Sequence, residues 1–307
     1  MNVLVTGGAG FIGSNLVDAY LGRGDDVVIV DDLSSGKKEN INPKAKFYHL
    51  DIQDPGIEEI FKEHKIDLVN HHAAQIDVRK SVVDPILDAR INIIGLLNIL
   101  QNCIQYGTKK VIFASSGGVV YGEPEILPAR EDYPLIPLSP YGVTKLTTEK
   151  YLYYYHNTYG LDYTILRYGN VYGPRQDPYG EAGVIAIFIN KLLKRETPTI
   201  YGDGEQVRDY IYVGDVVKAN LLVSAEGSTE AFNIGTGIPT SVNKLLKKVQ
   251  GVMDCYLDPI YGPKRPGEIY RSYLECQKAK EYLGWTAEVG LEEGLKKTLE
   301  FFAEKAD

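Results

Sequence analysis

A tyrosine and a lysine four positions apart carry the clearest chemical potential in this sequence. Tyr141 and Lys145 follow Ser139-Pro140, a typical helix start, so the two side chains share one helix face. A free phenol has a pKa of about 10, and a neighbouring ammonium group stabilises its phenolate. The pattern predicts that Tyr141 acts as a base near neutral pH with Lys145 as its cationic partner. The same spacing at Tyr106 and Lys110 joins a helix end to a strand start, so that pair does not share a face.

Two serines can add a hydroxyl group to this chemistry. Ser115 and Ser116 close an apolar run from Lys110 that predicts a strand. Ligands of open α/β folds bind at the carboxyl ends of the strands. We therefore expect these hydroxyls to hold a substrate oxygen whose proton Tyr141 removes.

A glycine-rich segment predicts a dinucleotide site. Gly7, Gly8, Gly10 and Gly13 fit both G-x-G-x-x-G and G-x-x-G-x-x-G, and they stand between a predicted strand and a predicted helix. Glycines let the backbone approach a pyrophosphate, whose charge the amides at the helix N-terminus then neutralise. The strand before and the helix after are the context that this mechanism requires.

Acidic residues at the ends of the next two strands suggest contacts to the rest of a dinucleotide. Asp31-Asp32 end the second predicted strand, where a carboxylate accepts hydrogen bonds from a ribose and repels a 2′-phosphate. This favours NAD over NADP, although Lys37-Lys38 nearby keep NADP open. Asp51-Ile52 stand where they can touch the adenine, but a lone aspartate at such a turn is also typical of a helix cap.

The elements around these residues alternate between strands and helices. Strands are predicted at 2–6, 26–31, 46–50, 67–72, 110–115 and 162–168, and helices at 11–23, 55–64, 81–106 and 139–159. Such alternation predicts a doubly wound parallel sheet with helices on both faces. The turn-rich segment 173–180 stops the alternation, so we expect a second, smaller domain after it, with a closing helix at 291–303.

Composition and charge exclude several classes of protein. The chain has 307 residues, of which 44% are hydrophobic, and a net charge of −8, so neither nucleic acid nor an anionic membrane is expected as a partner. Phosphate groups must then be bound by local cations. Three cysteines without a C-x-x-C pattern predict reduced thiols in a cytoplasmic protein, and five histidines without ligand spacing predict no metal site. No apolar run approaches the roughly 18 residues of a membrane span.

At these residues the sequence resembles the extended short-chain dehydrogenase/reductase family over essentially its whole length. The matching segments are 4–13, 32–36, 72–75, 116–122, 141–145, 166–175, 208–213 and 232–235. Within the family it is most similar to the branch of UDP-glucose 4-epimerases. The resemblance implies a Rossmann sheet with a smaller, discontinuous α/β substrate domain. Residues 1–170, joined by 208–237, would bind NAD, and mainly 171–307 would bind a UDP-sugar.

The resemblance also implies roles for individual residues. Tyr141 is the base and acid, Lys145 its cationic partner and a ribose ligand, and Ser116 the hydroxyl donor. Two positions depart from the family without removing a required group, since His72 replaces a common leucine and Asp32 a common asparagine. Contacts to NAD are expected at Gly7, Gly10, Phe11, Ile12, Gly13, Asp31, Asp32, Leu33, Ser35, Gly36, Asp51, Ile52, Ala73, Ala74, Gln75, Asn92, Ser115, Tyr141, Lys145, Tyr168 and Val171.

The substrate contacts come from the same resemblance. Arg208 and Arg265 match two arginines that grip a diphosphate, and Asn170 matches an asparagine beside the same phosphates. Ser272 stands at a gate position where a small side chain leaves room for an N-acetyl group, so UDP-N-acetylhexosamines are expected as substrates besides UDP-glucose and UDP-galactose. Further contacts to the substrate are expected at Ser116, Tyr141, Val184, Tyr201 and Glu268.

The implied reaction moves a hydride from C4 of the sugar to NAD⁺ while Tyr141 takes the O4 proton, and a rotated 4-keto sugar then receives the hydride on its other face. A homodimer through the two long helices is also implied. A UDP-glucuronate 4-epimerase or another sugar-nucleotide enzyme of the family remains an alternative, and a non-catalytic dinucleotide sensor a remote one. Dehydratases are disfavoured, because Gly117-Gly118 stand where those enzymes carry an acid and Glu123 follows too late.

Overall fold

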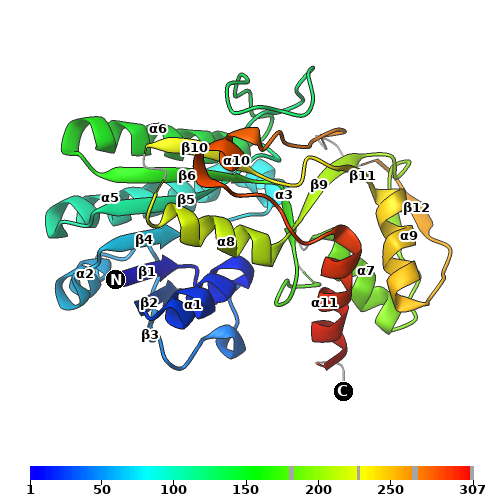
Figure 1. Cartoon of the computed structure of the whole chain (residues 1–307), viewed down its shortest axis with the longest axis horizontal. Coiled ribbons are helices and arrows are strands. Elements are labelled where there is room, and N and C mark those ends of the chain that lie inside the picture. Colours follow the sequence, from blue (N-terminus) through cyan, green and yellow to red (C-terminus); the bar gives the residue numbers. More distant parts are fainter. Residues whose placement is uncertain (180–182, 227–228, 265–268, 305–307) are drawn as a thin grey trace.

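The largest element of the fold is a seven-stranded parallel sheet. The computed structural model describes residues 1–179, 183–226, 229–264 and 269–304, and its main sheet has the order β10-β6-β5-β4-β1-β2-β3 (Figure 1). These strands are β1 (Asn2–Thr6), β2 (Asp26–Asp31), β3 (Lys46–His49), β4 (Leu68–His71), β5 (Lys110–Ser116), β6 (Asp162–Tyr168) and β10 (Glu230–Ile234). The strand order reverses between β1 and β4, which is where open α/β sheets bind ligands. All six predicted strands are confirmed, each within one residue at either end.

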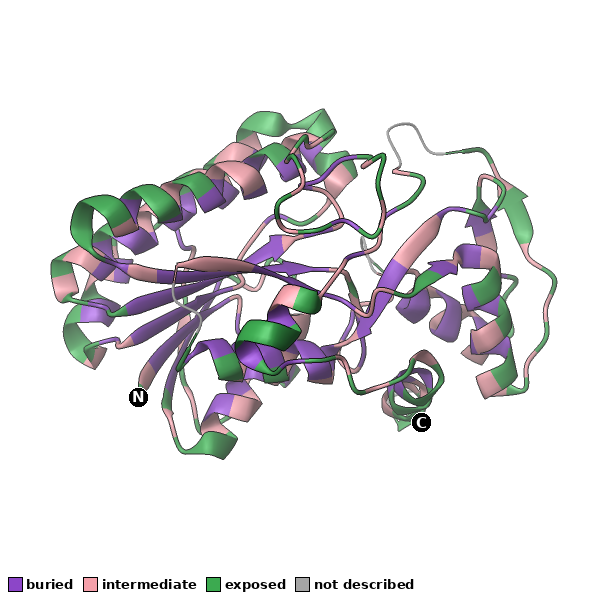
Figure 2. Cartoon of the chain, turned by 45° about the horizontal axis from the view of Figure 1, so that its top comes forward, coloured by how far each residue is buried: buried purple, intermediate pink, exposed green. Residues whose placement is uncertain are grey.

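Helices cover both faces of this sheet. On one face lie α1 (Phe11–Arg23) and α8 (Val213–Val223), and on the other α2 (Ile57–His64), α5 (Gly95–Tyr106) and α6 (Pro140–Tyr159). The side chains of a strand alternate between its faces, so Val3 and Val5 of β1 join the core with α1, while Leu4 joins the core with α5. Figure 2 shows the strands buried between the two layers of helices. The predicted doubly wound α/β fold is confirmed.

The predicted continuous helix at 81–106 is wrong. That region contains α3 (Val78–Val83), α4 (Pro85–Ala89), a π-helix η2 (Arg90–Ile94) and then α5. Pro85 has no N–H and disfavours helical geometry in the residue before it, so Asp84 takes φ −134° and ψ 78° and separates α3 from α4. Asp84 then caps α4 by accepting a 2.9 Å hydrogen bond from the N–H of Leu87.

A smaller unit lies beside the carboxyl ends of the large sheet (Figure 1). It contains a three-stranded sheet, β11-β9-β7, and a two-stranded sheet, β12-β8. Its elements are β7 (Asn170–Tyr172), α7 (Val184–Leu193), β8 (Thr199–Tyr201), β9 (Val207–Tyr212), β11 (Pro239–Ser241), α9 (Val242–Met253), β12 (Ile260–Gly262) and α11 (Leu291–Glu304). Phe188, Leu245 and Leu295 from its three helices share one apolar core. The predicted closing helix is confirmed with one additional residue.

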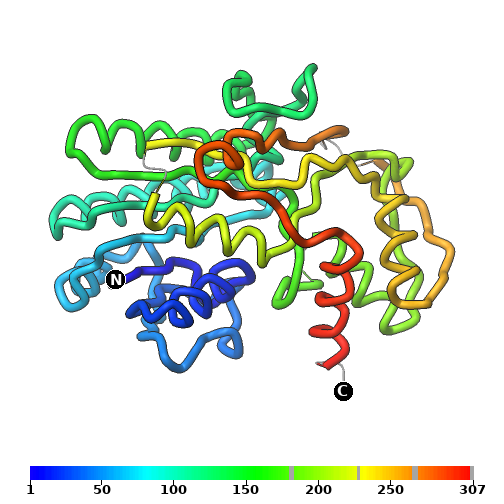
Figure 3. Tube along the Cα trace, in the orientation of Figure 1, coloured from blue at the N-terminus to red at the C-terminus, as the bar shows by residue number. Residues whose placement is uncertain are grey.

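The chain passes more than once between the two units, as Figure 3 shows along the trace. After β9 it returns to the large sheet through α8 and β10, which pairs with β6. It returns once more through α10 (Gln277–Leu283), whose Ala279 and Leu283 pack in the core beneath α1 and α8. The smaller α/β unit is therefore discontinuous, as predicted. No helix among the described residues is long and apolar enough to span a membrane.

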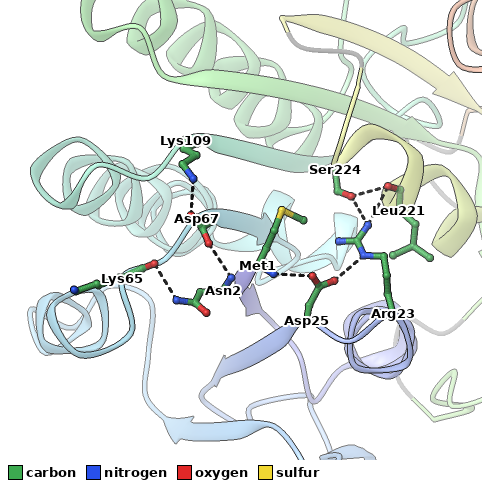
Figure 4. A network of polar contacts seen from close by, with 9 residues as sticks. All are labelled: Met1, Asn2, Arg23, Asp25, Lys65, Asp67, Lys109, Leu221 and Ser224. Carbon is green, nitrogen blue, oxygen red and sulfur yellow. Dashed lines mark hydrogen bonds and ion pairs between the residues drawn. The ribbon is translucent and has the colours of Figure 1, made fainter.

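Polar contacts tie together the amino ends of the central strands (Figure 4). The amino group of Met1 donates to Asp25 at 3.0 Å, and Nε of Arg23 donates to the same carboxylate at 2.7 Å. Asp67 accepts from the N–H of Asn2 at 3.0 Å and from Nζ of Lys109 at 2.8 Å. These contacts lie at the edge of the sheet opposite to the predicted site.

Candidate active site

The glycine loop between β1 and α1 forms a cradle with no room for side chains. Gly7 has φ +69°, a left-handed conformation, and a Cβ on Gly13 would lie 2.1 Å from the carbonyl oxygen of Gly7. The N–H of Gly10 donates to the same oxygen at 3.1 Å. The first turn of α1 contains no acidic side chain, so its free amides meet no competing charge. The loop therefore fits the pyrophosphate of a dinucleotide.

Asp31 holds the next loop against this cradle. Its Oδ2 accepts from the N–H of Ala9 at 3.0 Å, and its Oδ1 accepts from the N–H of Leu33 at 2.8 Å. A Cβ on Gly36 would lie 2.5 Å from Oδ1, so the carboxylate leaves no space for a side chain there. Burial raises the pKa of Asp31, whereas Asp32 is exposed. Asp31 is thus the carboxylate that the fold fixes beside the glycine loop.

The loop after β4 closes the site on the other side of β1. A Cβ on Gly7 would lie 2.7 Å from the backbone nitrogen of Ala73, so the two loops pack backbone to backbone. The N–H of Gln75 donates to Oδ1 of Asn92 at 2.9 Å, and Asn92 is buried on η2. The structure therefore packs Ala73 on the glycine loop and ties Asn92 to the same loop after β4 through Gln75.

Tyr141 and Lys145 share one face of α6, as their spacing predicts. Ser139 caps this helix by accepting a 3.2 Å hydrogen bond from the N–H of Gly142, and Pro140 opens its first turn. Nζ of Lys145 lies 5.7 Å from the centre of the Tyr141 ring and donates to the carbonyl of Ala114 at 2.8 Å. Both side chains are buried, with 9% of Tyr141 and 4% of Lys145 exposed.

Burial sets the protonation of this pair. It raises the pKa of the Tyr141 phenol, and the nearby charge of Asp88 raises it further. Burial also lowers the pKa of Lys145 to about 8, against the opposing effect of Asp88 and Glu149. The chain by itself therefore holds Tyr141 as a phenol, and a base at this position needs an additional positive charge next to the ring.

The two serines at the end of β5 point to different partners. Oγ of Ser115 donates to Oε1 of Glu149 at 2.6 Å, so the hydroxyl proton of Ser115 is already used in a hydrogen bond. Ser116 is half-buried, and a Cβ on Gly118 would lie 3.6 Å from its Oγ and 3.9 Å from Oδ1 of Asn170. Ser116 and Asn170 thus approach the same point from neighbouring segments, which leaves Ser116 as the serine that can turn to a ligand.

The other residues predicted for the cofactor lie along the same edge, but several are packed inside the protein. Tyr168 is 5% exposed, and its hydroxyl contacts Nδ2 of Asn220 at 2.8 Å and Nε2 of His72 at 3.2 Å. Ile52 is in the core, where a Cβ on Gly95 would lie 2.5 Å from it. Val171 lies in the middle of β7, in the small sheet, opposite Ile211 of β9. The remaining ones border the loops or lie in the first turn of α1: Phe11, Ile12, Ser35, Asp51 and Ala74.

Two of the predicted substrate residues lie side by side on the smaller unit. Nη1 of Arg208, on β9, donates to the carbonyl of Val207 at 2.9 Å and to that of Tyr270 at 3.4 Å. The N–H of Ser272 donates to the same carbonyl of Val207 at 3.1 Å, and only 7% of Ser272 is exposed. Arg208 and Ser272 therefore lie next to each other, joined by the carbonyl of Val207.

The rest of the predicted substrate residues are spread over several elements. Asn170 begins β7, opposite Tyr210 of β9 in the small sheet. Val184 begins α7 and Tyr201 ends β8. Arg265 and Glu268 lie outside the described residues.

Three charged residues at the site escaped the sequence analysis. Glu149 accepts from Nε and Nη2 of Arg167 at 3.0 and 2.7 Å, and 4% and 5% of the two residues are exposed. Asp88 is fully buried beside Thr144. An arginine inside the apolar run of β6 was a signal for a buried partner, whereas nothing in the local pattern marks Asp88. Among the described residues no group of three or more His, Cys, Asp or Glu side chains could hold a metal ion.

Comparisons with known proteins agree with this geometry. A family profile described as the NAD dependent epimerase/dehydratase family matches residues 3–235. The chain belongs to this family. A relative from Mycolicibacterium smegmatis, named UDP-glucose 4-epimerase, is 45% identical over 312 residues, and the match covers 100% of both chains. The resemblance to the extended short-chain dehydrogenase/reductase family and to its epimerase branch is confirmed.

Solved structures of this family match the whole fold. UDP-glucose 4-epimerase with UDP-glucose from Thermotoga maritima shares 52% identity and a TM-score of 0.99 over 100% of both chains. UDP-glucose 4-epimerase in complex with NAD from Thermus thermophilus shares 44% identity and a TM-score of 0.94 over 99% of both chains. The expected cofactor, NAD, agrees with the family, and the cradle at Gly7 to Gly13 fits it.

Proposed function

We propose that this chain is an NAD-dependent epimerase that interconverts UDP-glucose and UDP-galactose at C4 of the sugar. The observation that carries the proposal is Tyr141 beside Lys145 at the end of β5, next to a backbone cradle that fits a dinucleotide. Relatives named UDP-glucose 4-epimerase along the full chain support it. Gly117-Gly118 offer no carboxylic acid to protonate a leaving hydroxyl group, so a dehydratase lacks support.

The chain's own residues perform proton transfer in this proposal. NAD⁺, when bound, supplies the hydride acceptor and the positive charge that the phenol lacks. Oη of Tyr141 takes the O4 proton of the sugar and later returns it, while the Lys145 ammonium stabilises the phenolate. Oγ of Ser116 holds O4 by a hydrogen bond. Because burial lowers the pKa of Lys145 to about 8, the cationic support is present below that pH and is lost as the pH rises through it.

The binding contacts follow the two units of the fold. We propose that the glycine loop, Asp31 and Asn92 hold the cofactor, within the unit of residues 1–170 that the chain rejoins after β9 through α8 and β10. Arg208, Arg265 and Asn170 would bind the diphosphate of the UDP-sugar, mainly within 171–307. An acidic chain needs such local cations, because its overall charge repels phosphate.

The Ser272 side chain supports a wider choice of sugar. It is small and buried beside Arg208, so an N-acetyl group could occupy the space that a larger residue would fill. We expect Ser272→Tyr to abolish turnover of UDP-N-acetylglucosamine while kcat/KM for UDP-galactose stays within about threefold, a difference of less than about 1 kcal/mol in transition-state binding. Equal loss of both activities would contradict a gate at this position.

An exposed apolar surface supports a homodimer, and the free cysteines support a cytoplasmic location. Ile86 on α4 and Ile94 on η2 are 72% and 55% exposed, and they line a 400 Å³ cavity together with Arg90. Apolar surface of this kind is usually covered by a partner. The three free cysteines fit a reducing compartment. Light scattering of an Ile86→Asp variant tests the dimer: the mass should fall to that of one chain, and an unchanged oligomer would place the interface elsewhere.

A panel of UDP-sugars tests the activity directly. The purified protein should contain bound NAD, and it should convert UDP-galactose to UDP-glucose without added oxidant. The panel should include UDP-glucuronate and UDP-N-acetylglucosamine, so that preference for either is seen. NAD-loaded protein that converts none of these sugars would refute the proposal.

A further inference from the structure

Asp88 is a buried carboxylate that the proposed reaction does not use. It lies on α4, none of it is exposed, and in the part of the chain that the structure describes it forms no ion pair. A buried charge without a counter-ion destabilises a fold unless several hydrogen bonds compensate for the lost water. The contacts of Asp88 therefore need an explanation.

Three side chains donate to this carboxylate. Its Oδ1 accepts from Nε2 of Gln75 at 2.8 Å and from Nδ2 of Asn92 at 3.1 Å. Its Oδ2 accepts from Oγ1 of Thr144 at 2.9 Å. The donors come from the loop after β4, from η2 and from α6. One carboxylate thus joins both segments proposed to contact the cofactor with the helix that carries Tyr141.

The π-helix contributes to this convergence. Asp88 and Asn92 are four residues apart, so both face inward, and Asn92 also binds the backbone of Gln75 through two hydrogen bonds of 2.9 and 3.0 Å. A π-helical turn is uncommon and occurs often at functional sites. The unit formed by Asp88, Asn92 and Gln75 packs against Thr144 of α6, the residue directly before Lys145.

The charge of Asp88 also acts on the proposed catalytic pair. Burial is the main cause of the raised pKa of Tyr141, and the charge of Asp88 is the second cause. The same charge raises the pKa of Lys145 and so opposes the effect of burial there. Glu149 on α6 acts on Lys145 in the same direction. His71, the last residue of β4, and His72 after it stay neutral, because burial, followed by the charge of Lys145, lowers the pKa of each to about 3.

We propose that Asp88 is a positioning residue that holds Gln75, Asn92 and Thr144 against the cofactor site. It also lies close to the proposed base, because Oγ1 of Thr144 is 2.9 Å from both Oδ2 of Asp88 and the carbonyl oxygen of Tyr141. The inference rests on the proposed epimerase function. The Asp88 carboxylate would have two effects: it positions the residues that contact the cofactor, and its negative charge acts on Tyr141, the proposed base.

Asp88→Asn separates these effects, because the amide keeps the size of the carboxylate and removes its charge. Loss of the negative charge favours the phenolate and disfavours the ammonium. Both limbs of the pH profile of kcat/KM should therefore move to lower pH, by at least about half a unit. NAD should also dissociate from the holoprotein about tenfold more readily, since an amide donates where the carboxylate accepts. Asp84→Asn on the same helix is the matched control, because Asp84 is exposed and asparagine caps a helix equally well.

The outcomes separate this inference from the proposed function. Wild-type protein without epimerase activity would refute the proposed function, whereas active wild-type protein and a folded Asp88→Asn variant with unmoved pH limbs and unchanged NAD retention would refute only the role of Asp88. A variant that loses activity with unmoved limbs would show a structural role alone and would also overturn the proposal. Should Asp88→Asn not fold, Thr144→Val removes one donor, and kcat should fall about tenfold; an unchanged kcat would contradict the proposed positioning.

Discussion

The amino ends and the carboxyl ends of the strands, here called the amino edge and the carboxyl edge of the large sheet, carry similar ion pairs in opposite surroundings. At the amino edge Lys109 and Asp67 lie 2.8 Å apart, with 77% and 30% of their side chains exposed. At the carboxyl edge Arg167 and Glu149 lie 2.7 Å apart, with 6% and 4% exposed. The two distances are nearly equal, but the Arg167–Glu149 pair is shielded from solvent and joined by two hydrogen bonds, whereas the Lys109–Asp67 pair is exposed and joined by one.

Solvent exposure decides what each edge contributes. An exposed pair stabilises a protein by about 0–1 kcal/mol, because water screens the charges and already solvates them. Removing one partner of a buried pair costs about 3–5 kcal/mol, because the other charge stays buried and unpaired. We therefore expect the amino edge to tolerate substitution, and the carboxyl edge, which carries the proposed site, to be the more sensitive one.

The largest effect is expected at Tyr141, the proposed catalytic phenol. Tyr141→Phe removes the proposed proton acceptor and should lower kcat about 10²–10⁴-fold, the usual contribution of general acid–base catalysis. Circular dichroism and the NAD content should remain those of the wild type. Near wild-type epimerisation in this variant would show that another group moves the proton.

The buried ion pair should respond next, through stability. Glu149→Gln leaves Arg167 without its counter-ion and should lower the free energy of unfolding by about 3 kcal/mol, as measured in urea. The charge of Glu149 also raises the pKa of Lys145, so its loss should weaken the cationic support of the phenolate and lower kcat as well. If stability changed by less than about 1 kcal/mol, as at an exposed pair, the contrast between the edges would be broken.

The glycine cradle should be sensitive in cofactor binding. A Cβ at residue 13 would lie 2.1 Å from the carbonyl oxygen of Gly7, so Gly13→Ala must displace the loop. We expect about 100-fold weaker NAD retention, because displaced backbone amides lose hydrogen bonds to the charged pyrophosphate, each of which contributes about 1.5–3 kcal/mol. Gly22→Ala, where a Cβ meets open space, is the control and should bind NAD as the wild type does.

The smallest effect is expected at the amino edge. Lys109→Met removes one charge from the network of Figure 4 and should change the free energy of unfolding by less than about 1 kcal/mol. Epimerase activity should be unchanged. A loss as large as that of Glu149→Gln would mean that exposed and buried pairs are equivalent in this fold.

Much of the fold could be predicted because its signals are local. The strands at 2–6, 26–31 and 162–168 follow from β-branched runs between turns, and the helix at 11–23 from its periodicity. The error at 81–106 arose because apolar periodicity continues through Pro85, while the missing N–H of that proline breaks the helix. The helix-breaking effect of proline could have been applied to the sequence at this position, and in the structure it outweighs the apolar periodicity.

Two parts of the site could be predicted because they depend on short spacing along the chain. These are the glycine loop between a strand and a helix, and Tyr141 beside Lys145 on one helix face. The tertiary structure alone decided which charges are buried. Asp88 meets Gln75, Asn92 and Thr144, and Glu149 meets Arg167, because the large sheet brings distant segments to one edge. Burial depends on everything packed around a group, so no spacing along the chain reveals it.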